Sequence, residues 1–157
     1  MYDSTATYQD LETSDIDTVV LPVGAIEQHG PHLPLSVDWF QGDAVARLVA
    51  GRLGAYLLPG MPFGCSQAHV GFRGSIFLAP ETLGAVVKDV ATSLLAQGFR
   101  RIAVLNFHGG NLILKLVVRD LNLKQNDGKV VLVNPAQDAA TLLSEILDGY
   151  GDEQHAG

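Results

Sequence analysis

Short β-branched runs alternate with amphipathic segments along most of the chain, and this alternation limits its folds more than any other feature. The runs "IDTVVLPVGA" (16–25), "RRIAVLN" (100–106) and "KVVLVNP" (129–135) are typical of buried strands. Between them, residues 43–55, 79–99 and 112–124 have the apolar spacing of helices. Strands and helices in this order form a mostly parallel sheet with helices on both faces, so we predict an α/β fold.

Two of the helical segments carry start or stop signals. Residues 79–99 begin with Pro80 and Glu81 and end near Gly98, which predicts an amphipathic helix of about five turns. Residues 43–55 end near Gly54, a typical helix stop, and four apolar side chains recur at helical spacing before it: Val45, Leu48, Val49 and Leu53.

Three other segments have weaker patterns. We expect residues 56–64 to form a strand and a loop, and residues 74–80 to form an additional strand in a hairpin-like excursion. We expect residues 136–157 to form a helix followed by a Gly-rich loop. No linker or repeat interrupts the pattern, so we expect residues 1–157 to form a single domain.

Composition supports one soluble domain and excludes several function classes. Of the 157 residues, 47% are hydrophobic and 17% are charged, which is enough apolar content for a real core. The net charge is −7 and no Lys/Arg run forms a basic patch, so we expect no nucleic-acid partner. There is no apolar run of the roughly 20 residues that span a bilayer, so we expect no membrane partner.

The cysteine count and the N-terminus suggest the compartment. Cys65 is the only cysteine in the sequence, so no intramolecular disulfide can form. The first residues, "MYDSTATYQD", lack the basic and then apolar pattern of a signal peptide. We therefore expect a cytoplasmic protein.

Metal-ligating residue types gather after the first predicted strand, in "VGAIEQHGPHLPLSVDWF" (23–40). Glu27 and His29 are two residues apart, so in extended backbone they project from the same face, as two ligands of one metal ion require. We expect Asp38 to lie on the loop beyond, where its carboxylate folds back over the same point. His32 has either a chemical role or a hydrogen bond to backbone in a loop.

A second histidine motif, "FHGGN" (107–111), follows another predicted strand. Side chains at the carboxyl ends of strands in an open α/β sheet converge on one crevice, so His108 is expected near Glu27 and His29. Spacing alone leaves open whether His108 is a ligand or a buried core histidine. We expect Gly109 and Gly110 to allow close approach or a positive φ, and Asn111 to cap the next helix.

Carboxylates and neutral imidazoles together suit zinc, manganese or ferrous iron, and the absence of cysteine ligands argues against a closed structural zinc site. Open coordination positions indicate catalysis. A divalent ion held in this way lowers the pKa of bound water from about 15.7 toward 7 and polarises an amide carbonyl. Elsewhere, His69 is either a supporting or substrate-binding group or part of the loop surface, and Cys65 is expected to be a small buried hydrophobe.

Four sequence blocks together resemble the signature blocks of the creatininase (creatinine amidohydrolase) family, in the family's order: "LPVGAIEQHGPHLPLSVD", "GCSQAHVGFRGSIFL", "NFHGGN" and "HAG". The resemblance implies a three-layer α/β/α fold with a mostly parallel central sheet. It also implies a metal-dependent amidohydrolase that cleaves a C–N bond of a cyclic amide, formamide or related small amide by metal-activated water. Members of this family are usually hexameric, so the resemblance implies a homo-oligomer.

The resemblance carries over to individual residues. Glu27, His29, Asp38 and His108 match the family's metal ligands, with Asp38 as the carboxylate that can bridge two ions, so one or two divalent ions (Zn, Mn or Fe) are implied per chain. His155, in "HAG", matches the histidine that acts on the substrate. Creatininase has a Glu where this chain has Gly110, and the family domain continues beyond the "HAG" block, so we expect the C-terminal part of that domain to be lacking.

Three functional hypotheses follow from the sequence. The first is the metal-dependent amidohydrolase. The second is a truncated, catalytically silent metal-binding paralogue that acts as a subunit or regulatory protein. The third is a nucleotide- or sugar-binding α/β module without a metal, which the absence of a G-x-G-x-x-G fingerprint after the first strand disfavours.

Overall fold

The computed structural model describes residues 1–124 and 127–135. Its elements, in chain order, are α1 (Tyr8–Glu12), β1 (Thr18–Val23), α2 (Val37–Leu53), β2 (Tyr56–Leu57), the 3-10 helix η1 (Gln67–His69), α3 (Pro80–Ala96), β3 (Arg101–Asn106), α4 (Ile113–Lys124) and β4 (Lys129–Val133). Within these ranges, every helix is too short or too polar to cross a membrane. The predicted C-terminal helix and His155 lie outside the described residues.

The strands pair in parallel throughout the described sheet, in the order β2-β1-β3-β4. The register between the two central strands runs from Thr18 opposite Arg101 to Val23 opposite Asn106. Because parallel strands in this register end side by side, the segments that follow β1 and β3 leave the sheet at the same edge.

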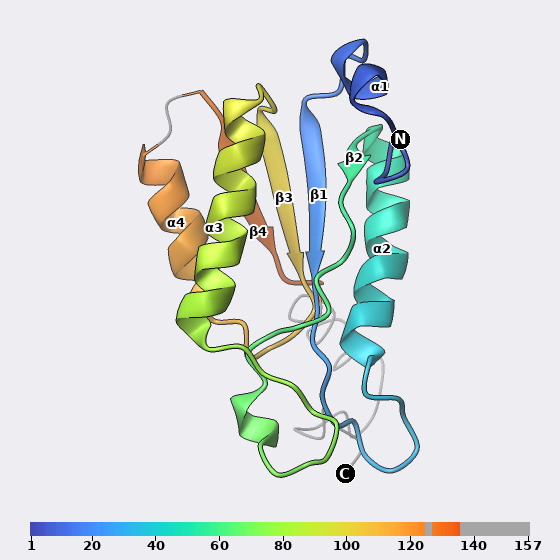
Figure 1. The fold of residues 1–157 in the computed structure, drawn as a ribbon, viewed down its shortest axis with the longest axis vertical. Helices are drawn as coiled ribbons and strands as arrows, with labels where there is room; N and C mark the ends of the chain where they lie inside the picture. Colours follow the sequence, from blue (N-terminus) through green and yellow to red (C-terminus); the bar gives the residue numbers. More distant parts are fainter. Residues whose placement is uncertain (125–126, 136–157) are drawn as a thin grey trace, which may run out of the picture.

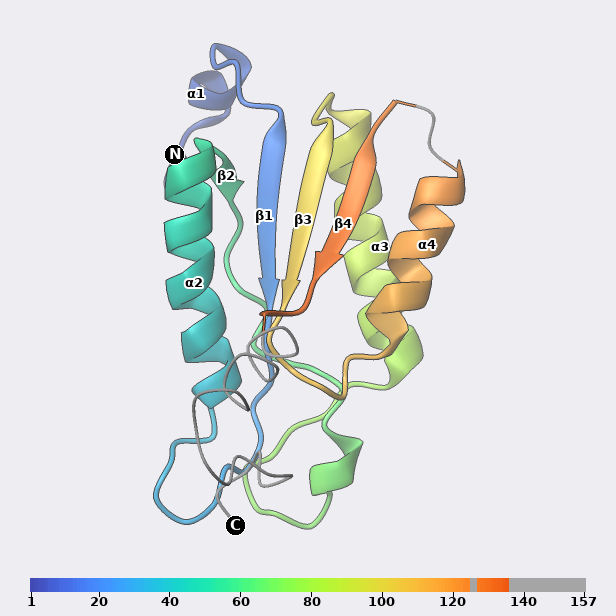
Figure 2. The ribbon, with the colours of Figure 1, turned by 180° about the vertical axis from the view of Figure 1, so that it is seen from behind.

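Helices cover both faces of the sheet (Figures 1 and 2). On one face, α2 packs Ala46 and Ala50 against Val20, Leu105 and other apolar side chains. On the opposite face, α3 and α4 pack over the alternate residues of the same strands, such as Val19 and Val104. This arrangement confirms the predicted three-layer α/β/α fold with a parallel central sheet.

The two helices of the second face also confirm their predicted ranges. Helix α3 has Pro80 in its first turn with Glu81 beside it, and the chain reverses at Gly98, whose φ of 97° suits a glycine. Its buried residues recur at helical spacing: Leu83, Gly84, Val87, Ala91 and Leu94. Helix α4 buries Leu114, Val118 and Leu121 in the same way.

Helix α2 differs from its prediction in both its start and its buried face. It begins at Val37, six positions before the expected 43–55 segment, so Asp38 lies in its first turn and not on a loop. Its buried positions are small or polar: Asp38, Gly42, Ala46 and Ala50. Leu48 and Leu53, which helped to predict the helix, are exposed. Residues four apart lie on one helix face, and small side chains there let α2 approach the sheet closely.

Residues 56–64 form the expected strand and loop, with a short strand, whereas the additional strand expected at 74–80 is replaced by single-residue bridges. Strand β2 covers only two residues before Pro59 and Gly60, and pairing resumes as a bridge between Val23 and Met61. In the second segment, Ile76 bridges Ile26, and Phe77 bridges Gly64. Gly71 and Gly74 have positive φ just before these bridges, and α3 begins at Pro80 just after them.

Helix α4 supplies a matched test of the core. Leu114 is 0% exposed in the core cluster under α3, whereas Leu116, two residues later, is 60% exposed. We expect Leu114→Ala to lower the free energy of unfolding by about 2–5 kcal/mol, because it leaves a cavity in a packed layer. Leu116→Ala is expected to change it by less than about 0.5 kcal/mol. Urea denaturation measures both, and equal effects would contradict the assigned face.

Candidate metal centre

The candidate site forms where β1 and β3 end. The amide of Phe107 donates to the carbonyl of Val23 at 2.9 Å, so the two strands stay paired to the point where both histidine motifs begin. Gly24 then leaves room for the first turn of α2, because a Cβ there would lie 2.8 Å from the Trp39 backbone. The pairing and this close approach bring Glu27, Asp38 and His108 to the same place.

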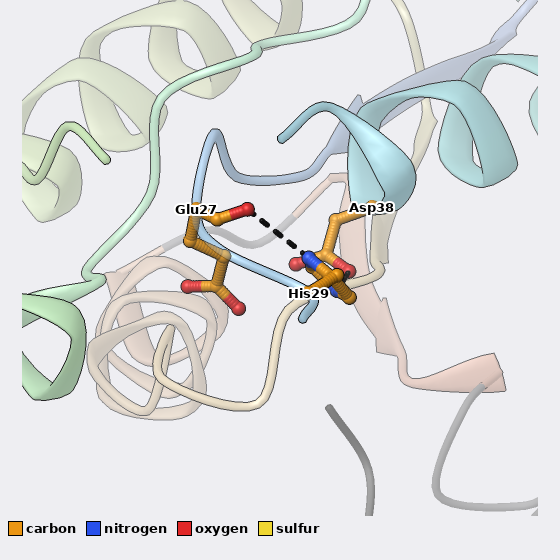
Figure 3. Close-up of side chains that lie close together, drawn as sticks. All are labelled: Glu27, His29 and Asp38. Carbon is orange, nitrogen blue, oxygen red and sulfur yellow. Dashed lines mark hydrogen bonds and ion pairs between the residues drawn. The ribbon is translucent and has the colours of Figure 1, made fainter. Parts of the chain in front are cut away.

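Three predicted ligands form one buried group. One ligand atom each from Glu27, His29 and Asp38 lies within 4.8 Å of the other two. Figure 3 shows Asp38 projecting from the start of α2 beside His29. Their exposed fractions are 0%, 5% and 8%, so the group is almost closed to solvent.

His108 joins this group from β3. Its Nδ1 lies 3.1 Å from Oε1 of Glu27 and 3.1 Å from Oδ2 of Asp38. The other oxygen of Asp38, Oδ1, lies 3.2 Å from Nε2 of His29. Asp38 therefore lies between two histidines and faces each with a different oxygen. The structure thus brings together the four residues that the sequence suggested as ligands.

Backbone carbonyls orient both imidazole rings. The Nδ1–H of His29 donates to the carbonyl oxygen of Glu27 at 3.1 Å, and the Nε2–H of His108 donates to the carbonyl oxygen of Cys65 at 3.2 Å. Because a carbonyl oxygen only accepts, these two nitrogens carry the hydrogens. The remaining nitrogen of each ring faces the carboxylates, which is the arrangement of a histidine that is oriented to bind a metal.

The charges in the group are strongly coupled. Burial by itself raises the pKa of Glu27, but hydrogen bonds from His108 and Ser66 outweigh it, and the pKa lies below its ordinary value. Burial by itself lowers the pKa of His108, but hydrogen bonds to Asp38 and Glu27 outweigh this, and the pKa rises to about 10. The two buried carboxylates thus favour the protonated form of the His108 imidazole. A divalent cation would compensate the same two negative charges.

The donor set fits a divalent metal. Two carboxylates and two oriented imidazoles supply oxygen and nitrogen ligands of the kind that zinc, manganese and ferrous iron accept. The thiol of Cys65 is not among these donors. Its side chain packs in the hydrophobic core, where burial raises the pKa of the thiol, and only its backbone carbonyl faces the site, as the acceptor for the His108 ring. The prediction that Cys65 is a buried hydrophobe is confirmed.

Two further histidines lie in different settings. His32 is exposed on the loop before α2 and takes no part in the described cluster. His69, in η1, lies with its Nε2 3.7 Å from Oε1 of Glu27 and accepts a hydrogen bond from Gln28 at Nδ1. The amide of Gly30 donates to Oε1 of Gln28, which fixes the orientation of that side chain. His69 is therefore a neighbour of the site, in keeping with the supporting role that the sequence left open.

Sequence reasoning missed a network of asparagines beneath the site. Asn111 was expected to cap the next helix, but its Oδ1 accepts from the amide of Cys65 at 2.8 Å. Its Nδ2 donates to Oδ1 of Asn106 at 3.0 Å and to the carbonyl of Gly24 at 3.4 Å. The "HGGN" motif contained the signal, since a polar residue that follows two glycines at a strand end can face inward as easily as cap a helix.

The two glycines of that motif have different surroundings. Neither is among the glycines with positive φ in the described residues. A Cβ at Gly110 would overlap the carbonyl oxygen of Cys65 and Nε2 of His108, whereas a Cβ at Gly109 would meet open space. Close approach, one of the two expected reasons, therefore applies to Gly110 alone. This backbone leaves no space for a side chain at position 110.

Comparisons with known proteins agree with the sequence blocks. The family model Creatininase, described as creatinine amidohydrolase, matches residues 4–157. A creatinine amidohydrolase of Pseudomonas putida is 34% identical over 155 residues, which cover 88% of this chain and 60% of that protein. A mycofactocin precursor peptide peptidase of Mycobacterium tuberculosis (strain CDC 1551 / Oshkosh) is 36% identical over 105 residues, which cover 60% of this chain and 41% of that protein.

Solved structures give the same result for the fold. A structure named "Creatininase Mn" superposes with a TM-score of 0.81 at 30% identity, and the match covers 99% of this chain and 68% of that one. The match with this chain thus spans about two thirds of the length of that structure, and a smaller share of the length of each of the two curated relatives.

The contacts of Gly110 predict a local effect on the site. We expect Gly110→Ala to lower the free energy of unfolding by about 1–3 kcal/mol, because its Cβ forces the Cys65 carbonyl and the His108 ring apart. Gly109→Ala is the matched control and is expected to change it by less than about 0.5 kcal/mol. Chemical denaturation measures both variants. If Gly110→Ala were as stable as Gly109→Ala, the Cys65 carbonyl and the His108 ring could not lie so close to the backbone of residue 110.

Proposed function

The chain belongs to the creatininase family, and we propose on this premise that it is part of a metal-dependent amidohydrolase. The proposed reaction is cleavage of a C–N bond in a cyclic amide, formamide or related small amide. The observation that carries the proposal is the buried group of Glu27, His29, Asp38 and His108.

The arrangement of Asp38 supports the proposed ligand roles. Its two oxygens face two different histidines, and Glu27 faces the same nitrogen of His108, Nδ1, that Asp38 faces. The carboxylate of Asp38 is therefore placed to bind one ion or to bridge two ions. We propose zinc, manganese or ferrous iron as the metal, and similar creatininase structures are named with manganese and with zinc.

The residues of the chain have separate tasks in this proposal. A bound divalent ion supplies Lewis-acid polarisation of the amide carbonyl and makes water more acidic. Glu27 and Asp38 compensate the charge of the ion, and the backbone carbonyls of Glu27 and Cys65 hold the two histidine rings in place. We propose, from the family resemblance, that His155 delivers a proton to the leaving nitrogen.

The relatives support a reaction class more than a single substrate. One is named for creatinine and another for a precursor peptide, and both names describe cleavage of a C–N bond. In the loop between β2 and α3, His69 lies beside Glu27 and the hydroxyl of Ser75 accepts a hydrogen bond from the amide of Gln28, so substrate choice is proposed to depend on that loop. We propose a small amide as the substrate.

Metal content tests the proposal directly. We expect protein purified without chelator to contain about one or two equivalents of divalent metal, measured by elemental mass spectrometry. Asp38→Ala is expected to lose most of it, because the substitution removes the carboxylate between the two histidines. Asp43→Ala is the matched control on the same helix, where Asp43 pairs with Arg47 at the surface, and it is expected to keep the metal.

Three results would contradict the ligand assignment. The first is a metal-free wild-type protein that does not take up zinc, manganese or iron. The second is equal loss of metal in the Asp38→Ala and Asp43→Ala variants. The third is unchanged metal content in His108→Ala.

Turnover separates the ligands from His155. We expect the metal-loaded protein to hydrolyse at least one member of a panel of creatinine-like lactams, formamides and short peptides. His155→Ala is expected to lower kcat by about 10²–10⁴-fold without changing metal content, because general acid–base groups contribute in that range. Metal binding without turnover on the panel would instead favour a metal-binding protein without catalysis.

A further inference from the structure

The side chain of Asn111 links three segments that lie far apart in the sequence. It is 2% exposed and makes hydrogen bonds to Gly24 after β1, to Cys65 in the loop after β2, and to Asn106 at the end of β3. Both ends of its amide are therefore occupied. A side-chain amide that is buried and bonded in this way holds its partners in a fixed arrangement.

Cys65 connects this amide to the metal centre. Its N–H donates to Oδ1 of Asn111, and its own carbonyl oxygen accepts from Nε2–H of His108. The two bonds use the backbone N–H and the backbone carbonyl of the same residue. The position of Asn111 therefore sets the position of the carbonyl that fixes the His108 ring.

A second route runs from Asn111 to the backbone of His108. Nδ2 of Asn111 donates to Oδ1 of Asn106, and Nδ2 of Asn106 donates to the carbonyl oxygen of His108 at 3.0 Å. The backbone of His108 and its ring thus both depend on the same asparagine. This double dependence distinguishes Asn111 from a residue that only stabilises a turn.

The backbone around Asn111 leaves no room for adjustment. A Cβ at Gly64 would lie 2.7 Å from Oδ1 of Asn111 and 2.6 Å from the carbonyl oxygen of Gly24. A Cβ at Gly110 would overlap the Cys65 carbonyl. The Asn111 amide and the Cys65 carbonyl therefore pack directly against the backbone of Gly64 and Gly110, where a side chain would not fit.

We propose that Asn111 is a positioning residue that, through the backbone of Cys65, makes Nδ1 and not Nε2 of His108 the metal-binding nitrogen. The inference rests on the proposed function, since it assumes that His108 binds a metal. Without the carbonyl of Cys65 in place, either nitrogen of the ring could face Glu27 and Asp38. The asparagine network removes one of these two orientations before the metal arrives.

Asn122 supplies a matched control. Its side chain also bonds the backbone twice, donating to the carbonyl of Val130 at 2.7 Å and accepting from the amide of Val130 at 2.9 Å. It joins α4 to β4, away from the site. Asn122→Ala therefore removes a bridge of the same kind without touching the route to His108.

The experiment compares metal binding in the wild-type chain, Asn111→Ala and Asn122→Ala. Cobalt(II) and zinc dissociation constants are measured by competition with a chromogenic chelator, and the cobalt absorption spectrum reports on the ligands. We expect Asn111→Ala to weaken binding about 10–100-fold and to alter the cobalt spectrum, as loss of a group that orients a ligand does. Asn122→Ala is expected to lower Tm while its dissociation constants and spectrum stay those of the wild type.

A measurement on the wild-type protein keeps the inference testable if Asn111→Ala does not fold. In ¹⁵N-labelled, zinc-loaded wild-type protein, long-range ¹H–¹⁵N spectra of the His108 ring are expected to show a protonated Nε2 and a zinc-bound Nδ1. Zinc on Nε2, or equal metal affinity in Asn111→Ala and Asn122→Ala, would overturn the inference and leave the proposed function standing. Failure of the wild-type protein to bind either metal would overturn both.

Discussion

The parallel pairing of β1 with β3 brings the two histidine motifs of the candidate site together. Val23 is opposite Asn106, and the amide of Phe107 continues the pairing past the last strand residue. Because the two strands end together, the motifs that follow them reach the same point above the sheet. A slip of two residues would keep the hydrophobic faces of the strands buried but would separate His108 from Glu27 by more than a hydrogen bond.

Burial of two carboxylates is the main electrostatic cost of this arrangement. Glu27 and Asp38 lie almost fully out of solvent, and His108 lies between them at 3.1 Å from each. An isolated buried charge is strongly unfavourable, so the group requires a positive partner, which is either the proton on His108 or a bound cation. The same side chains that create this cost therefore also create affinity for a metal.

The sequence predicted most of the architecture, and the four residues that it suggested as ligands lie together in the structure: Glu27, His29, Asp38 and His108. Alternating β-branched and amphipathic segments sufficed for the layers, because burial against a two-sided sheet imposes those patterns. The buried face of α2 was not predictable in this way, since its contacts use Gly42, Ala46 and Ala50 and leave Leu48 exposed. Asp38 was assigned to a loop for the same reason. The asparagine network was missed because hydrogen bonds between segments leave no periodic pattern in a sequence.

The candidate ligands are distributed unevenly along the chain, and this has a consequence for biosynthesis. Glu27, His29 and Asp38 all precede the end of α2's first turn, whereas His108 arrives only with β3, and 87 residues separate the bonded pair Gly24 and Asn111. During synthesis, three ligands therefore leave the ribosome well before the fourth, while β1 still lacks its central neighbour. Long-range parallel pairing is slow to form. The four candidate ligands can therefore come together only after β3 has docked against β1.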